Sequence, residues 1–149
     1  MGHPSILTKA LHACGVRLPE ANIQAEFYHH AKILGINAVL ELSTPVGRLD
    51  IAVLDGSGSN LIAVVECKSN DQKVVTKTNQ IRRYMQIGVP VYGLADIQRA
   101  EHLVCTIKEK YIDNKAYEGK PLSEIFSMPR VHRRLSYRSR YPDLNIKNG

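Results

Sequence analysis

The sequence lacks an apolar run long enough to cross a membrane. Its longest aliphatic run is Leu61 to Val65, far short of the ~20 residues that a bilayer-spanning helix needs. The first residues also lack the charged-then-apolar pattern of a secretory signal. We therefore expect a soluble, intracellular protein of the cytoplasm, with no membrane partner.

Cysteine is scarce as well, with Cys14, Cys67 and Cys105 as the three residues of this type. No two of them show the close spacing of a zinc knuckle or a redox motif, so we expect free thiols. Internal repeats, low-complexity segments and a glycine-rich phosphate loop are also missing. A length of 149 residues favours one domain, since domains commonly hold ~100 to 200 residues.

The positive charge is concentrated at one end of the chain. The net charge is +6, and residues 128–149 hold six basic residues and one acid, which leaves +1 for residues 1–127. Between Arg130 and Arg140 there are five arginines and no acid, interleaved with His132, Tyr137 and Tyr141. Such a composition suits contacts with phosphates and stacking on bases or sugars. A solvated helix face is the simpler alternative.

Apolar spacing and loop signals predict the order of the elements. Helices are expected over 20–34, 76–87, 96–110 and 122–126, and strands over 37–42, 48–54, 61–68 and 89–94. The second and third strands should form an antiparallel hairpin, and the fourth should run parallel to an earlier strand because a helix precedes it. The predicted fold is α/β, a small mixed sheet flanked by helices. We place a core in residues 1–112 and a basic C-terminal extension, packed on that core, in residues 113–149.

The hairpin brings two acids together. If its turn is centred near Gly58, Asp50 lies directly across from Glu66, with Cβ atoms ~5 Å apart. Period-two alternation places Ile62, Val64, Glu66 and Lys68 on one face of the strand, and Leu61, Ala63, Val65 and Cys67 on the other. Two close carboxylates repel each other unless a cation compensates, and hard oxygen ligands suit Mg²⁺. A surface hairpin with ordinary charges is the alternative.

Four motifs in this order resemble the PD-(D/E)xK nuclease superfamily. They are Glu26 in A-E-F-Y, Asp50 in G-R-L-D-I-A-V-L, Glu66-Cys67-Lys68 in V-V-E-C-K-S, and Gln80 to Tyr84 in Q-I-R-R-Y. The last is similar to the Q-x-x-x-Y element of the RecB-like branch. The resemblance covers residues 20–95 and implies a restriction-endonuclease-like core. Leu49 departs from the pattern, which has proline at this position.

The resemblance also implies roles for these residues. Asp50, Glu66 and the Cys67 main-chain carbonyl would bind Mg²⁺, with Mn²⁺ as a substitute, and Lys68 would position or activate the attacking water. Glu26 would hold a second ion or bind through water. Gln80 is counted with the catalytic residues, and Gln80 and Tyr84 would face the scissile phosphate or orient Lys68. His30 lies within the apolar stripe of its helix, where a structural imidazole is commoner than a ligand.

These observations predict a Mg²⁺-dependent DNA endonuclease, of a restriction-like or homing type, acting as a homodimer or higher homo-oligomer near the nucleoid. A junction-resolving or repair nuclease and a non-cleaving nucleic-acid-binding subunit of the same fold are the alternatives. The residues assigned to DNA contact are Arg48, Lys77, Arg83, Tyr84, Arg130, Arg133, Arg134, Arg138 and Arg140.

Overall fold

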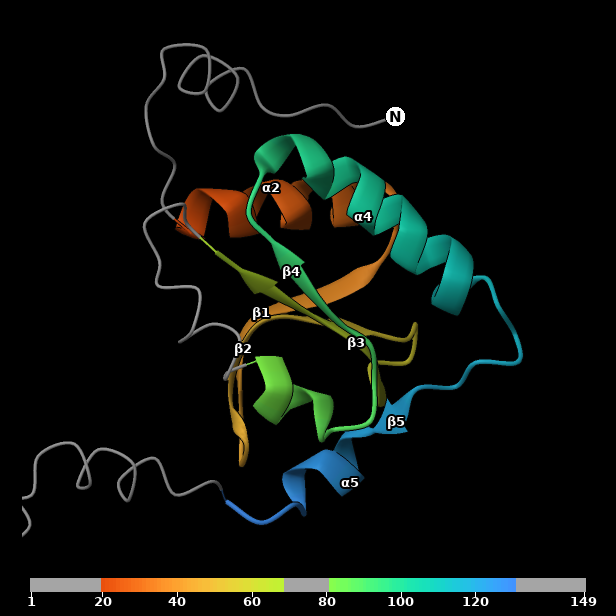
Figure 1. Ribbon diagram of the computed structural model, residues 1–149. Helices are drawn as coiled ribbons and strands as arrows, with labels where there is room; N and C mark the ends of the chain where they lie inside the picture. Colours follow the sequence, from red (N-terminus) through yellow and green to blue (C-terminus); the bar gives the residue numbers. More distant parts are fainter. Residues whose placement is uncertain (1–19, 69–80, 131–149) are drawn as a thin grey trace, which may run out of the picture.

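The computed structural model describes residues 20–68 and 81–130, and Figure 1 shows their arrangement. In chain order the elements are α2 (Glu20–Ile33), β1 (Asn37–Thr44), β2 (Gly47–Leu54), β3 (Asn60–Cys67), β4 (Val91–Leu94), η1 (Ile97–Arg99), α4 (Ala100–Ile107), η2 (Lys108–Ile112), β5 (Lys120–Pro121) and α5 (Leu122–Phe126). Residues 81–85 are also helical. The elements predicted within these ranges are confirmed, with small shifts at their ends.

The strands form one five-stranded mixed sheet. Its order is β1-β2-β3-β4, and β5 pairs with β3 as well. Strand β2 is antiparallel to both β1 and β3, whereas β4 runs parallel to β3. The antiparallel hairpin and the parallel fourth strand are therefore as the sequence predicts.

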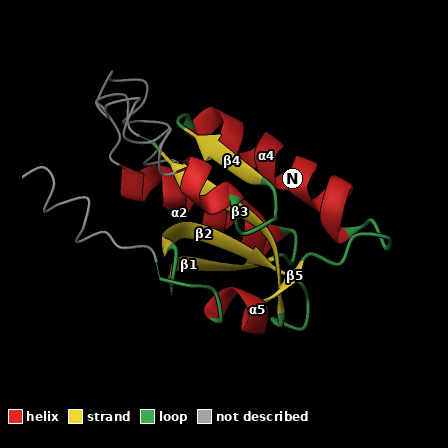
Figure 2. Cartoon of the chain, turned by 60° about the horizontal axis from the view of Figure 1, so that its bottom comes forward, coloured by secondary structure: helices red, strands yellow, loops and turns green. Residues whose placement is uncertain are grey.

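Helices cover both faces of this sheet. Helices α2 and α4 pack on one face, through residues such as Phe27 and Val104. The helical residues 81–85 and α5 lie on the other, through Tyr84 and Ile125, and Figure 1 shows the strands between the two layers. Figure 2 shows α4 and α5 on opposite sides of the strands. In the part of the chain that the structure describes, no helix is both long and apolar enough to cross a membrane.

The faces of β3 differ from the prediction at the start of the strand. Val53 pairs with Ala63 but Leu54 pairs with Leu61, so Ile62 is an extra residue in the ladder. A bulge of this kind reverses the faces of the residues that precede it. Ile62 consequently packs with Ala63, and Leu61 packs with Val64. The predicted alternation is wrong for Leu61 and Ile62.

The core continues beyond residue 112, where we placed its boundary. Strand β5 pairs with the first residues of β3, and the Tyr117 hydroxyl donates to the Ile62 carbonyl over 2.8 Å. Ile125 is completely buried. Residues 117–128 therefore complete the sheet and the core, and the boundary at residue 112 is wrong. The described part of this segment ends at residue 130.

Candidate functional site

The predicted carboxylate pair is present between β2 and β3. Ile51 pairs with Val65, which places Asp50 opposite Glu66 as the hairpin register requires. The Cys67 N–H donates to Asp50 Oδ2 over 2.8 Å, and the Asp50 N–H donates to Glu66 Oε1 over 3.2 Å. Each strand thus supplies a main-chain donor to the carboxylate of the other strand.

Burial of these two carboxylates lowers the stability of the folded protein unless other groups compensate. Glu66 is completely buried and Asp50 is half-buried. A buried carboxylate is costly unless hydrogen bonds or an opposite charge stabilise it, and two neighbouring anions also repel each other. The main-chain donors offset part of this cost. A bound cation would offset the repulsion between the two carboxylates.

The strand ladder is interrupted at Asp50. The pairs of β1 with β2 run from Asn37↔Leu54 to Leu40↔Ile51 and resume at Leu42↔Leu49, which omits Glu41 and Asp50. Glu41 has a φ of 54°, a left-handed backbone conformation that residues other than glycine rarely adopt. Gln24 of α2 donates from Nε2 to the Asp50 carbonyl oxygen over 2.6 Å. A side chain from the helical layer therefore supports the backbone at the candidate metal ligand.

Lys68 follows directly after β3 and lies beside β4. Its N–H donates to the Leu94 carbonyl over 2.8 Å. Its side chain runs over Gly93, where an added Cβ would lie 3.0 Å from Lys68 Cε and 3.2 Å from Nζ. Gly93 is also the strand partner of Glu66. The absence of a side chain at Gly93 thus leaves room for the Lys68 amine over β4, next to the strand that carries Glu66.

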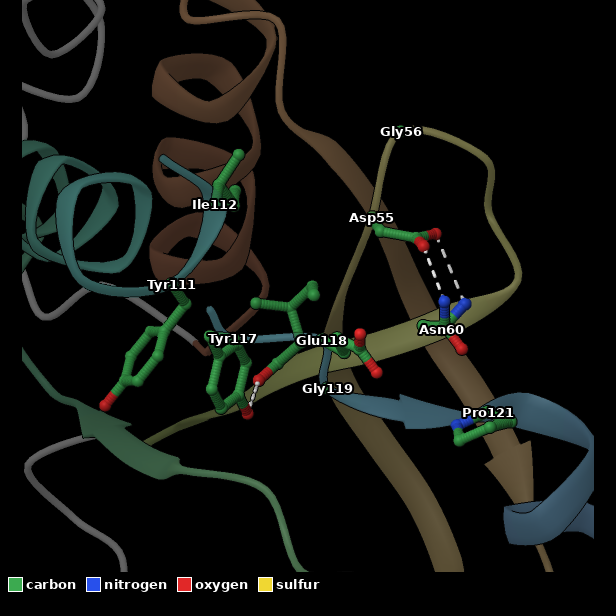
Figure 3. Close-up of a pocket in the computed structure, with 10 residues that line it drawn as sticks. Asp55, Gly56, Asn60, Tyr111, Ile112, Tyr117, Glu118, Gly119 and Pro121 are labelled. Atoms are coloured by element: carbon green, nitrogen blue, oxygen red, sulfur yellow. Dashed lines mark hydrogen bonds between the residues drawn. The ribbon is translucent and has the colours of Figure 1, made fainter. Parts of the chain in front are cut away.

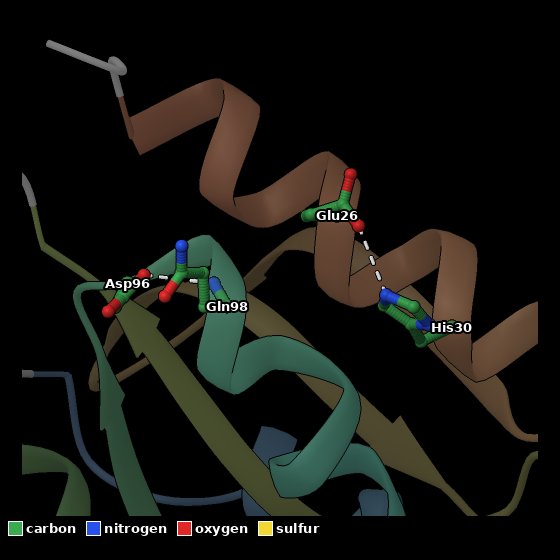
Figure 4. A network of polar contacts seen from close by, with 4 residues as sticks. All are labelled: Glu26, His30, Asp96 and Gln98. Atoms are coloured by element: carbon green, nitrogen blue, oxygen red, sulfur yellow. Dashed lines mark hydrogen bonds and ion pairs between the residues drawn. The ribbon is translucent and has the colours of Figure 1, made fainter. Parts of the chain in front are cut away.

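Glu26 is bonded within its own helix. Its Oε2 lies 3.0 Å from His30 Nε2, one helical turn away, and both side chains are about 2% exposed. Figure 4 shows this pair beside the start of η1, where the Asp96 side chain caps the helix. The Glu26 carboxylate is therefore buried between α2 and the rest of the core. His30 takes the structural role that the sequence favours, and no group containing Glu26 forms a metal cluster within residues 20–68 and 81–130.

Tyr84 has a different place from the one that the resemblance implies. Its side chain is completely buried, and its hydroxyl donates to the Arg48 carbonyl over 2.8 Å. The prediction that Tyr84 contacts DNA or faces the phosphate is therefore wrong, because a side chain without exposed surface cannot reach a duplex. Its position instead fixes the β2 backbone two residues before Asp50.

The other residues predicted to contact DNA differ in how exposed they are. Arg48 and Arg130 are exposed, and Arg83 is half-buried. Cys67 is buried in the core, and Cys105 is half-buried. Several predicted residues lie outside the described residues, namely Cys14, Lys77, Gln80, Arg133, Arg134, Arg138 and Arg140.

A hollow of about 380 Å³ at the opposite end of β3 was not predicted. Figure 3 shows it beside Tyr111, Tyr117 and the Asp55 loop. Some of its polar groups bond to the protein: Asp55 accepts from Asn60, and the Tyr111 hydroxyl lies 2.9 Å from that of Tyr92. Burial, followed by the effects of Tyr111, raises the pKa of Tyr92 to about 12, so this hydroxyl stays protonated. None of the residues predicted for the site lines this hollow, and the carboxylate pair remains the candidate site.

The donor set of the pair fits one hard divalent cation. Within the described ranges no group of three or more His, Cys, Asp or Glu side chains is close enough to hold a metal. Mg²⁺ commonly needs only one or two carboxylates, because it keeps several waters and also binds substrate phosphates. Asp50 and Glu66 meet that requirement.

Comparison with known proteins adds no relative. No family model matches the chain, and neither does any curated protein or solved structure.

Proposed function

We propose that the chain is a Mg²⁺-dependent endonuclease that hydrolyses phosphodiester bonds in DNA. The observation that carries this proposal is a pair of hydrogen bonds between β2 and β3. The Asp50 N–H donates to the Glu66 carboxylate, and the Cys67 N–H donates to the Asp50 carboxylate, so both acids lie near the end of the strand that Lys68 follows. This arrangement requires strand register, burial and a lysine at one point of the sheet. A surface hairpin with ordinary charges would leave both acids in water.

In the proposed site each residue has a defined task. Asp50 and Glu66 would hold the ion, and the Cys67 carbonyl is a third candidate donor. When bound, Mg²⁺ supplies positive charge to the phosphate oxygens and lowers the pKa of a water molecule. Lys68 would steady the negative charge that develops during attack on phosphorus. Arg48, which is exposed on β2, would bind the sugar-phosphate backbone of the duplex.

Incubation with supercoiled plasmid tests the proposal. The purified chain should convert the plasmid to nicked and linear forms with Mg²⁺, and a chelator should stop the conversion. An Asp50→Asn variant purified in parallel controls for contaminating nucleases. Conversion that is equal with this variant, or unaffected by chelator, would refute the assigned site. Mapping the ends would separate restriction-like cleavage from junction resolution, and sedimentation would test the proposed homodimer.

A non-cleaving DNA-binding subunit is the second candidate function. It is favoured by the same hydrogen bonds, because both carboxylates also serve as acceptors for main-chain donors. In that case the pair would be a structural substitute for strand pairing and would need no ion. Metal binding therefore distinguishes the two candidates.

Metal should stabilise the folded protein. An ion that binds the native state alone adds about 2.7 kcal/mol at a concentration of one hundred times its Kd. Mg²⁺ should raise the Tm of the wild type but not that of an Asp50→Asn, Glu66→Gln double variant, measured by scanning calorimetry. An equal rise in both proteins would place the ion elsewhere.

The arginine-rich end should govern the salt dependence of DNA binding. Each phosphate that a protein neutralises adds ~0.9 to the slope of log affinity against log salt concentration. Replacing Arg133, Arg134 and Arg138 by alanine should flatten this slope by up to ~2.7, as measured by binding titrations at several salt concentrations. If one of the three reads a guanine edge, preference for the cognate site should also fall by ~1 to 3 kcal/mol. Unchanged slope and preference would remove this segment from the DNA interface.

A further inference from the structure

Gln24 is the side chain that links the helical layer to the candidate metal ligand. It lies partly buried on α2, and its Nε2 donates to the Asp50 carbonyl over 2.6 Å. This bond falls at the position where the pairing of β1 with β2 omits Glu41 and Asp50. Because buried carbonyl groups need a donor, Gln24 supplies support at a point where the regular ladder is broken.

Asp50 is consequently held at three points. Its carbonyl accepts from Gln24, its N–H donates to Glu66, and its carboxylate accepts from the Cys67 N–H. Two of these bonds join β2 to β3, and Gln24 provides the one that comes from α2. A change at Gln24 should therefore move the Asp50 carboxylate relative to Glu66 and leave the paired strands on either side in place.

Divalent cations differ in how strictly they require a fixed geometry. Mg²⁺ needs near-ideal octahedral coordination with oxygens at ~2.0–2.1 Å, whereas Ca²⁺ accepts irregular coordination at ~2.3–2.6 Å. A rigid carboxylate pair consequently favours the smaller ion. We propose that Gln24 is a positioning residue that holds the Asp50–Glu66 pair in a geometry selective for Mg²⁺ over Ca²⁺. This inference rests on the proposed function.

Two variants test Gln24, with one matched control. Gln24→Met keeps the length of the side chain and removes the donor, and Gln24→Asn keeps the amide but shortens its reach. Gln98→Met, the control, makes the same Gln-to-Met substitution at an exposed position of η1. Titration calorimetry with Mg²⁺ and with Ca²⁺ gives the selectivity. Amide hydrogen exchange of the metal-free protein shows whether the Cys67 N–H keeps its bond to the Asp50 carboxylate.

Both Gln24 variants should weaken Mg²⁺ binding by about 10- to 100-fold, the usual loss when a group supporting a metal ligand is removed. Their Ca²⁺ affinity should change much less. The Cys67 amide, which donates to Asp50, should exchange faster, while the Val65 amide within the paired strands should not. Gln98→Met should match the wild type in every measurement.

Other results would overturn the inference. An equal loss of affinity for both ions would indicate general loosening, and unchanged Cys67 exchange would show that Gln24 does not position Asp50. A wild type that binds neither ion would refute the proposed function together with the selectivity. Cys67 exchange would in that case still decide whether Gln24 positions the carboxylate, because that measurement uses no metal.

Discussion

Alanine at Lys68, Asp50 or Glu66 is expected to abolish plasmid cleavage, a loss of about 10³-fold or more, while DNA affinity stays within a few-fold. These groups act on charge that develops in the transition state, and interactions of this kind affect kcat more than substrate binding. Single-turnover cleavage and filter binding at the same Mg²⁺ concentration measure the two effects. Lys115→Ala, at an exposed position, is the control for loss of a lysine.

Isosteric variants make this test sharper. Asp50→Asn and Glu66→Gln each keep an oxygen that accepts from the main-chain donor, so they preserve the hydrogen bonds of the folded site. Their melting temperatures without metal should stay closer to the wild type than those of the alanine variants. Cleavage should nevertheless be lost, because the negative charge is gone. Unchanged cleavage by all the variants would refute the site.

Alanine at Gly119 is expected to destabilise the protein strongly. The residue has a φ of 73°, and an added Cβ would overlap the Leu61 carbonyl oxygen. The left-handed conformation and the overpacking together should cost about 2–5 kcal/mol. Urea unfolding measures this loss. Gly56→Ala is the matched control, because an added Cβ there has no heavy atom within 4 Å.

This comparison also tests where the core ends. Gly119 allows the chain to approach β3 closely just before β5 begins. If residues 113–130 were only an appendage, a clash at Gly119 would move the appendage and leave the core stable. A free energy of unfolding for Gly119→Ala equal to that of Gly56→Ala would therefore contradict the extended core.

The hairpin could be predicted because its signals are local. The loop Asp55 to Asn60 and the apolar strands on either side set the register, and Asp50 lies opposite Glu66 for that reason. The Glu26–His30 contact also had a sequence signal, since residues four apart on a helix are neighbours. Its burial could not be inferred, because burial depends on how α2 packs against α4.

Other features of the site depend on tertiary contacts. The bulge at Ile62 and the break at Glu41 leave no pattern in the sequence, and the bond from Gln24 joins elements that are distant in the chain. The burial of Tyr84 likewise depends on packing against the sheet. The short segment 120–126 has too few residues for a periodic pattern, so its place in the core was missed.

The position of a bound ion tests the central claim most directly. Crystals soaked in Mn²⁺, which carboxylate sites also accept, would reveal the ion by its anomalous scattering. The account predicts a peak between Asp50 and Glu66, within the ~2.0–2.6 Å that hard cations keep from oxygen ligands. The same soak of the Asp50→Asn, Glu66→Gln variant should show no peak there. An unoccupied pair in the wild type at saturating Mn²⁺, or a peak held by other residues, would contradict the proposed metal site.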